Sequence, residues 1–91
     1  MRLVLIEWLD SVGCSSEWRR LEVDHPQPLT CRSVGWLVHD GDECKVIVPH
    51  VTEATGEEVT RQGCGDMTIP TKAILSVTEL PLTNHAPLSK V

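Results

Sequence analysis

The sequence predicts a mainly β domain, built either as a small, strongly bent sheet or as a partly open barrel of the SH3-like or Sm-like type. Residues 3–10 and 31–51 carry alternating apolar runs, and residues 67–80 add two more strand-like runs around a proline-initiated turn. Five short strands, with one short helix after the first strand, are typical of such small β folds. The chain has 91 residues, which suits one domain. We assign this domain to residues 1–80 and expect residues 81–91, which lack periodicity, to form a frayed tail.

Residues 3–10, LVLIEWLD, are the first expected strand. Val4, Ile6 and Trp8 share one face of it. The other face holds three leucines and Glu7, so it is largely apolar as well. A strand with two apolar faces is expected at the centre of a sheet, or covered on both sides.

The next stretch, SVGCSSEW at residues 11–18, breaks this alternation and predicts the start of a helix. Gly13 permits a turn, and Ser15 or Ser16 can cap a helix by accepting a bond from a free backbone N–H. The run EWRRLEV, residues 17–23, then supplies about two helical turns. HPQP, residues 25–28, ends the helix because proline lacks an N–H and biases the preceding residue away from helix.

Residues 31–51 predict a β-hairpin. Val34, Trp36 and Val38 alternate along its first strand, so we expect Trp36 in the core, as we do Trp8. Asp40-Gly41 is a hairpin turn signal. The second strand ends at residue 49, a proline, which cannot donate to a strand ladder. Trp18 is therefore expected to be the most exposed of the three tryptophans.

A long polar loop is expected next, at residues 52–66. It includes one predicted helical turn from Thr55 to Val59, because Thr55 and Glu58 fit a capping box. Loops of this length in small domains often carry function. MTIP, residues 67–70, then predicts a short strand, Pro70-Thr71-Lys72 a turn, and residues 73–80 the last strand.

Composition excludes several classes of protein. The net charge of −5 argues against duplex nucleic acid as a partner, because binding it needs clustered Lys and Arg. The apolar run at the N-terminus is too short for an export signal, and no stretch reaches the ~18 apolar residues of a membrane span. We therefore expect a soluble, cytoplasmic protein with no membrane partner. The negative charge is concentrated in one part of the chain, where we interpret it as a solvated acidic surface: Asp40, Asp42, Glu43, Glu53, Glu57 and Glu58.

No metal or catalytic motif is present in the sequence. Four cysteines, Cys14, Cys31, Cys44 and Cys64, lack the close pairs of a zinc site, and nothing indicates the oxidising compartment that disulfides need. We expect free thiols, no metal and no cofactor. The phosphate-binding, dinucleotide-binding and zinc-protease motifs are also missing, and no nucleophile lies in a recognisable arrangement with a base. We therefore expect no enzymatic activity.

Binding is easier to argue than catalysis, and the strand exit and helix start are the expected site. This cluster offers hydroxyls, an aromatic plate, a guanidinium and the N–H groups of a helix start, which favour anions. The predicted ligand-binding residues are Asp10, Ser11, Ser15, Ser16, Trp18 and Arg19, with His50 at the rim of the long loop and Thr68 in a strand opposite that loop. The alternative is purely structural: a turn and helix cap, with Arg19 and Arg20 paired to Glu17 or Glu22.

The order of motifs resembles small accessory proteins encoded by bacteriophages and prophages. Their pattern is a strand ending in W-x-D-S, a Trp opening a short helix, S-V-G-[WY]-L-V, and I-P-x-x-x-I near the end. It spans roughly residues 4–80 of this chain. The matching positions are Trp8, Asp10, Ser11, Trp18, Ser33, Val34, Gly35, Trp36, Ile69, Pro70 and Ile74.

This resemblance implies a phage origin, and small accessory phage proteins often manage the host. We expect a non-enzymatic protein in the cytoplasm of the infected bacterium that binds and sequesters a small nucleotide-derived immune signal. The alternative is a protein-interaction module that inhibits a host protein through its acidic surface. A small core and an apolar first strand also predict a homo-oligomer that shares sheet edges between subunits.

Overall fold

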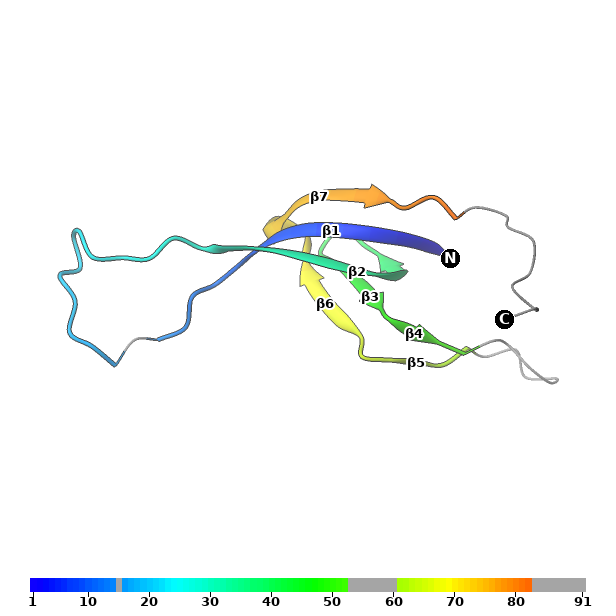
Figure 1. Ribbon diagram of the computed structural model, residues 1–91, viewed down its shortest axis with the longest axis horizontal. Coiled ribbons are helices and arrows are strands. Elements are labelled where there is room, and N and C mark those ends of the chain that lie inside the picture. Colours follow the sequence, from blue (N-terminus) through cyan, green and yellow to red (C-terminus); the bar gives the residue numbers. More distant parts are fainter. Residues whose placement is uncertain (15, 53–60, 83–91) are drawn as a thin grey trace, which may run out of the picture.

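The computed structural model describes residues 1–14, 16–52 and 61–82. It is mainly β, as the sequence predicts (Figure 1). The elements in chain order are β1 (Arg2–Asp10), β2 (Leu29–Asp40), β3 (Cys44–Val48), β4 (His50–Val51), β5 (Gly63–Cys64), β6 (Met67–Pro70), the 3-10 turn η1 (Thr71–Ala73) and β7 (Ile74–Glu79). No helix in the described part of the chain is long and apolar enough to cross a membrane.

A strongly bent antiparallel sheet of five strands forms the body of the molecule. Its strand order is β6-β3-β2-β1-β7, and a two-stranded ribbon of β4 and β5 extends from it. The sheet is not closed, because β6 and β7 remain its edges although they follow one another in the chain. The first strand, the hairpin, the MTIP strand, the proline-initiated turn and the last strand are thus confirmed. β1 is an interior strand, paired with β2 on one side and β7 on the other, as its two apolar faces indicated.

The core lies on one face of this sheet. Val4 and Ile6 of β1 are fully buried there, on the face that the alternation of residues 3–10 predicts. Leu37, Ile47 and Ile69 from β2, β3 and β6 complete the cluster, and Trp8 and Ile74 pack against it. The expectation for Trp8 is confirmed, since its half-buried ring contacts the core.

The expectation that Trp36 of β2 lies in the core is wrong. In the observed register Gly35 lies opposite Val4 and Trp36 opposite Leu3, so Gly35 and Leu37 face the core while Trp36 is half-buried on the other face. The physical reason is the close approach of β3. A Cβ atom on residue 35 would lie 3.0 Å from the Val48 carbonyl oxygen and 3.1 Å from the Ile47 Cβ. Only glycine leaves room for this crossing.

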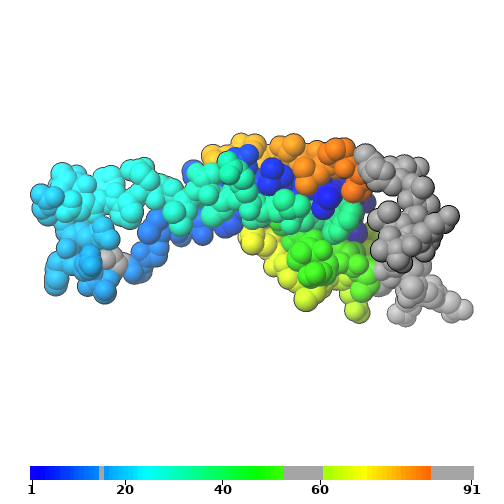
Figure 2. All heavy atoms as spheres, viewed as in Figure 1, coloured from blue at the N-terminus to red at the C-terminus, as the bar shows by residue number. Residues whose placement is uncertain are grey.

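The connection from β1 to β2, residues 11–28, is an arm that projects from one end of the sheet (Figures 1 and 2). The expected helix is not formed over its described residues, 16–28, where only a turn at residues 21–23 occurs. Val23 and Asp24 both donate their N–H to the Arg20 carbonyl oxygen, at 3.1 and 2.7 Å. A helix this short needs packing of its apolar face, and the arm offers nothing to pack against: Trp18 is fully exposed.

Some expectations lie outside the described residues. These are Ser15, the helical turn from Thr55 to Val59 with its capping box, the acidic residues Glu53, Glu57 and Glu58, and most of the expected tail, residues 83–91.

Candidate functional site

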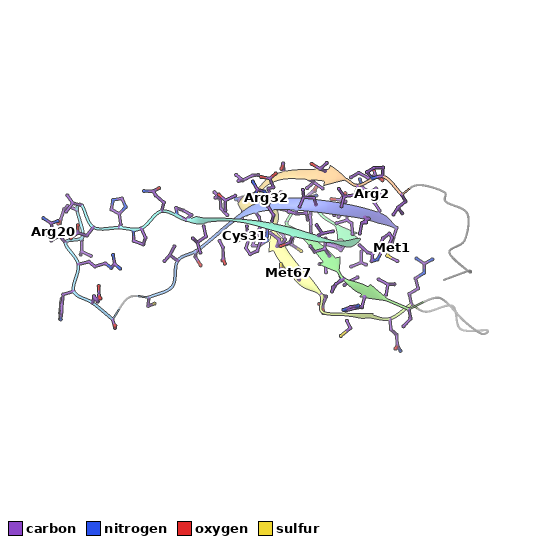
Figure 3. All side chains as sticks on the ribbon, in the orientation of Figure 1. Met1, Arg2, Arg20, Cys31, Arg32 and Met67 are labelled. Carbon is purple, nitrogen blue, oxygen red and sulfur yellow. The ribbon has the colours of Figure 1, made fainter. Side chains whose placement is uncertain are left out.

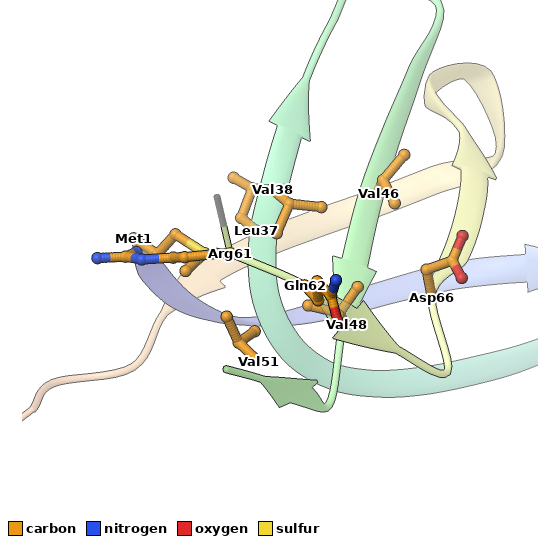
Figure 4. Close-up of a pocket in the computed structure, with 10 residues that line it drawn as sticks. Met1, Leu37, Val38, Val46, Val48, Val51, Arg61, Gln62 and Asp66 are labelled. Atoms are coloured by element: carbon orange, nitrogen blue, oxygen red, sulfur yellow. The ribbon is translucent and has the colours of Figure 1, made fainter. Parts of the chain in front are cut away.

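A hollow lies between the β2–β3 hairpin and the β4–β5 ribbon (Figure 4). Its volume is about 470 Å³, within the range of roughly 300–1,000 Å³ that is typical of small-molecule sites. The residues that line it are Met1, Leu37, Val38, Val46, Val48, Val51, Arg61, Gln62, Gly63 and Asp66. We call this space the hollow.

An apolar floor comes from two neighbouring strands. Val46 and Val48 alternate on β3, and their side chains therefore point to the same side of the strand. The register of β2 against β3 shifts between Leu37 and His39, which places Val38 in an irregularity. Such bulges re-aim side chains, and here Leu37 and Val38 both reach the hollow. Val51 of β4 adds a further apolar wall (Figure 4).

The polar groups of the hollow come from the ribbon and from the chain that follows it. Thr52 and Gln62 hold this part of the ribbon together: the Thr52 N–H donates to the Gln62 carbonyl oxygen at 2.8 Å, and the Gln62 N–H donates to the Thr52 Oγ1 at 2.9 Å. Gly65 then has a φ of 79°, a left-handed conformation that favours glycine, and turns the chain from β5 toward β6. Asp66 follows directly after this turn.

Charge is distributed unevenly around the hollow. Arg61 lies beside Met1 at one end, and Asp66 lies at the other end (Figure 4). Neither side chain forms an ion pair with any residue that the structure describes. The hollow therefore combines an apolar floor with a guanidinium, an amide and a carboxylate that have hydrogen-bonding capacity left for a ligand.

The structure does not bring the predicted ligand-binding residues together. Asp10 ends β1, where its Oδ1 accepts a bond from the Ser11 N–H at 2.8 Å. Ser16, Trp18 and Arg19 lie exposed on the arm, and Ser15 falls outside the described residues. The arm reaches away from the sheet at the end opposite Met1, as the positions of Arg20 and Met1 show (Figure 3). No helix start is present on residues 16–28 to supply the N–H groups that the sequence argument invoked.

His50 and Thr68, in contrast, lie in strands and not on the arm. His50 belongs to β4 and lines a shallower depression that shares Val51, Gln62 and Gly63 with the hollow. Thr68 belongs to β6 and pairs with Val46, a floor residue. Of the predicted residues that the structure describes, these two are therefore near the hollow, and the five from the strand exit and arm are not.

Sequence reasoning missed the lining residues themselves, above all Arg61, Gln62 and Asp66. A signal for Arg61 was present, because it is the only Lys or Arg in the long polar loop of residues 52–66. The apolar floor had no such signal. Val46 and Val48 alternate like the residues of any half-buried strand, so their sequence does not show that they line a hollow.

Part of the acidic segment is neutralised within the fold. Asp40 accepts a hydrogen bond from Lys45 of β3 and another from Arg2 of β1, the latter at 3.0 Å. The bond from Lys45 is the main reason why the pKa of Asp40 lies below its ordinary value, and Arg2 lowers it further. Asp42 and Glu43 are exposed in the adjoining turn.

The four cysteines are free thiols, with Cys14 and Cys64 exposed and Cys31 and Cys44 half-buried. They belong to the arm, β5, β2 and β3, respectively. Within the described ranges no group of three or more His, Cys, Asp or Glu side chains is arranged to hold a metal ion.

No protein-family model matches this chain, and no match to it was found among the curated proteins or the solved structures.

Proposed function

We propose that this protein is a non-catalytic binding module that retains a small nucleotide-like ligand in the hollow. The observation that carries the proposal is an apolar floor with a guanidinium at its rim, that of Arg61, which forms no ion pair with any described residue. The resemblance to phage accessory proteins supplies the biological setting: sequestration of a nucleotide-derived immune signal in the cytoplasm of the infected bacterium.

The physical demands of a nucleotide match the lining residues. A flat base loses water when it packs on the side chains of Val46 and Val48, which favours binding. A phosphate accepts charge-assisted hydrogen bonds from Arg61, which has the planar fork suited to bidentate contacts. Gln62 can donate to or accept from a base edge, and Asp66 can accept from an exocyclic amine.

Retention without turnover is supported by what lines the hollow. Among the described residues that line it, the ionisable side chains are Arg61 and Asp66, and none is Ser, Cys, His or Lys. Attack on a phosphorus or carbon atom needs an activated nucleophile or a positioned general base with its partner. A lone carboxylate opposite a guanidinium is a recognition pair, and tight binding alone is sufficient to lower the free concentration of a signal.

The test is titration calorimetry with AMP and with cyclic di-AMP against the wild-type protein and two arginine variants. Arg61→Gln removes the charge at the hollow, whereas Arg19→Gln removes the charge of another exposed arginine, on the arm. We expect Arg61→Gln to weaken binding about 10- to 100-fold, the worth of a charge-assisted hydrogen bond, and Arg19→Gln to leave it unchanged. The reverse order would place the site on the arm. Wild-type protein that binds neither nucleotide would contradict the proposal.

A second candidate function is supported by the arm and the acidic turn. Trp18, Leu21 and Val23 are exposed at 102, 82 and 62%, which is unusual for apolar side chains so close together. Aromatic residues of this kind often anchor protein interfaces, and Asp42 and Glu43 could steer a basic host protein toward them. A host inhibitor of this kind would lose its partner on Trp18→Ala or on the charge reversal of Asp42 and Glu43, while Arg61→Gln would leave the partner bound.

A further inference from the structure

We infer that β7 is an interface strand, through which a second copy of this chain pairs antiparallel to join the two sheets. This inference is independent of the proposed ligand. It starts from the two edges of the sheet, β6 and β7, which carry backbone groups with no strand partner on their outer sides in the described structure. Such edges tend to pair with other strands unless they are protected.

The two edges differ in their protection. β6 has only four residues and ends at Pro70, which has no N–H to donate. β7 has six residues, ILSVTE, with no proline and no lysine. Leu75 and Val77 of β7 are exposed at 54 and 38%. β7 is thus the longer and more apolar edge, and its one charged residue, Glu79, lies at its end.

The backbone of β7 defines which residues face the open side. The Leu80 N–H donates to the Leu3 carbonyl oxygen at 2.8 Å, so the polar backbone groups of Leu80 point toward β1. Along an antiparallel strand these groups alternate in direction from residue to residue. The N–H and C=O of Thr78 therefore also point toward β1, while those of Val77 and Glu79 point outward. This alternation holds up to the register shift opposite Glu7 and Trp8.

Two-fold pairing needs an outward-facing residue at its centre, because that residue must exchange hydrogen bonds with its own copy. A centre at Glu79 places two carboxylates directly opposite one another and sets Val77 against Pro81, which cannot donate. A centre at Leu75 brings η1 into the pairing. A centre at Val77 avoids both problems.

The register centred on Val77 is self-complementary along the strand. It sets Val77 against itself and Ser76 against Thr78 of the second copy, and it brings Leu75, at the register shift, beside Glu79. β-Branched and hydroxyl pairs of this kind stabilise adjacent strands. The two Glu79 carboxylates lie roughly 13 Å apart along the strand direction, four residues at the rise of a β-strand, so they do not oppose pairing. A second copy thus provides partners for the outward backbone groups of β7 without bringing like charges together.

The experiment measures the solution mass of three proteins by sedimentation equilibrium. We expect the wild type to approach twice the 10.1 kDa of one chain. Val77→Lys places two like charges directly opposite and should shift the mass toward one chain, whereas Val77→Thr keeps a β-branched residue and should remain dimeric. A monomeric wild type, or a Val77→Lys protein that stays dimeric, would overturn the inference.

A cysteine pair tests the register even if Val77→Lys does not fold. In a background with Cys14→Ser and Cys64→Ser, Val77→Cys puts two thiols on Cα atoms about 5.5 Å apart, which a disulfide can span. Ser76→Cys is the matched control, because its two copies are offset by two residues and lie beyond about 7 Å. Mild oxidation should link the Val77→Cys protein and leave the Ser76→Cys protein at the level of its parent. Equal linking of the two, or of neither, would overturn the register.

Discussion

The indole Nε1–H of Trp8 donates a hydrogen bond to the Ser33 hydroxyl oxygen, 3.0 Å away on the neighbouring strand. Ser33 lies opposite Ile6 in the register, so the bond runs diagonally across the core face from β1 to β2. The same hydroxyl points toward the Met67 sulfur at 3.9 Å, which extends the contact to β6. The indole therefore fills space against the core and also has a polar partner at the margin, as a half-buried tryptophan requires.

We predict that Trp8→Phe and Ser33→Ala each lower the free energy of unfolding by about 1 kcal/mol, and that the double variant loses less than the sum. Phenylalanine keeps an aromatic ring against the core and removes the donor, so the loss reports mainly on the hydrogen bond. Urea unfolding of the wild type and the three variants gives the coupling. Strictly additive losses would show that the two side chains do not act as a pair.

Gly35 should be the least replaceable glycine among those in the strands. Gly35→Ala sets a methyl group 3.0 Å from the Val48 carbonyl oxygen, and we expect it to destabilise the fold by about 1–3 kcal/mol as β3 is pushed from β2. Gly13→Ala is the control, because nothing lies within 4 Å of its Cβ position. Thermal unfolding should show a clear fall in Tm for the first variant and an unchanged or slightly higher Tm for the second. Equal effects would contradict the close crossing of the two strands.

Acid should weaken the junction of β1, β2 and β3 through Asp40. The hydrogen bond from Lys45, and to a lesser degree Arg2, holds the pKa of Asp40 below its ordinary value of 3.8 in the folded protein. The unfolded chain therefore binds this proton more readily than the folded one. The stability that Asp40 contributes is complete above its ordinary pKa and is lost as the pH falls through the lower, folded value.

Asp40→Asn should therefore be less stable than the wild type at neutral pH, and the difference should shrink as the pH falls below 3.8. Both charges of the pair are partly exposed, so salt should also reduce the difference. Asp24→Asn is the control: the pKa of Asp24 is likewise lowered, by Arg20, but that pair lies within the arm and joins no strands. Urea unfolding at several pH values measures both. A wild-type to Asp40→Asn difference that grows in acid would contradict the assignment.

Trp18 should behave as a surface residue in every respect. We expect Trp18→Ala to change the free energy of unfolding by less than about 0.5 kcal/mol, since the fully exposed side chain buries nothing. The variant should also lose the long-wavelength, readily quenched part of the tryptophan fluorescence. Trp8→Ala, in contrast, should cost several times more stability because that ring packs on the core. A blue-shifted Trp18 signal in the wild type would mean that the arm is covered in solution.

Much of the strand content could be predicted, because its signals are local. Alternation over residues 3–10, the Asp40-Gly41 turn and the proline at residue 70 each act within a few residues, and each has its expected counterpart in the structure. The helix was also predicted from local signals, namely a serine cap and an apolar spacing. It is not formed over residues 16–28, since short helices depend on packing that a projecting arm lacks.

The core face of β2 and the hollow could not be predicted in the same way. Residues 34–38 are apolar on both faces, so alternation alone does not say which face is buried. That choice depends on the pairing of Gly35 with Val4, a contact between residues far apart in the chain. The hollow depends on the bend of the sheet and on the ribbon of β4 and β5. These two strands are too short to leave a sequence pattern. Of the predicted site residues that the structure describes, only His50 and Thr68 lie near it.

The position of β1 in the sheet has a consequence for the order of folding during synthesis. β1 is made first, yet it lies between β2 and β7, and β7 is made last. Until residues 74–79 have left the ribosome, one side of β1 lacks its partner, and Ile74 is missing from the rim of the core. Contacts that join distant parts of a chain form slowly, and a strand edge left open meanwhile is prone to aggregation. A nascent chain that stalls before β7 is therefore expected to depend on chaperones until residues 74–79 can pair with β1.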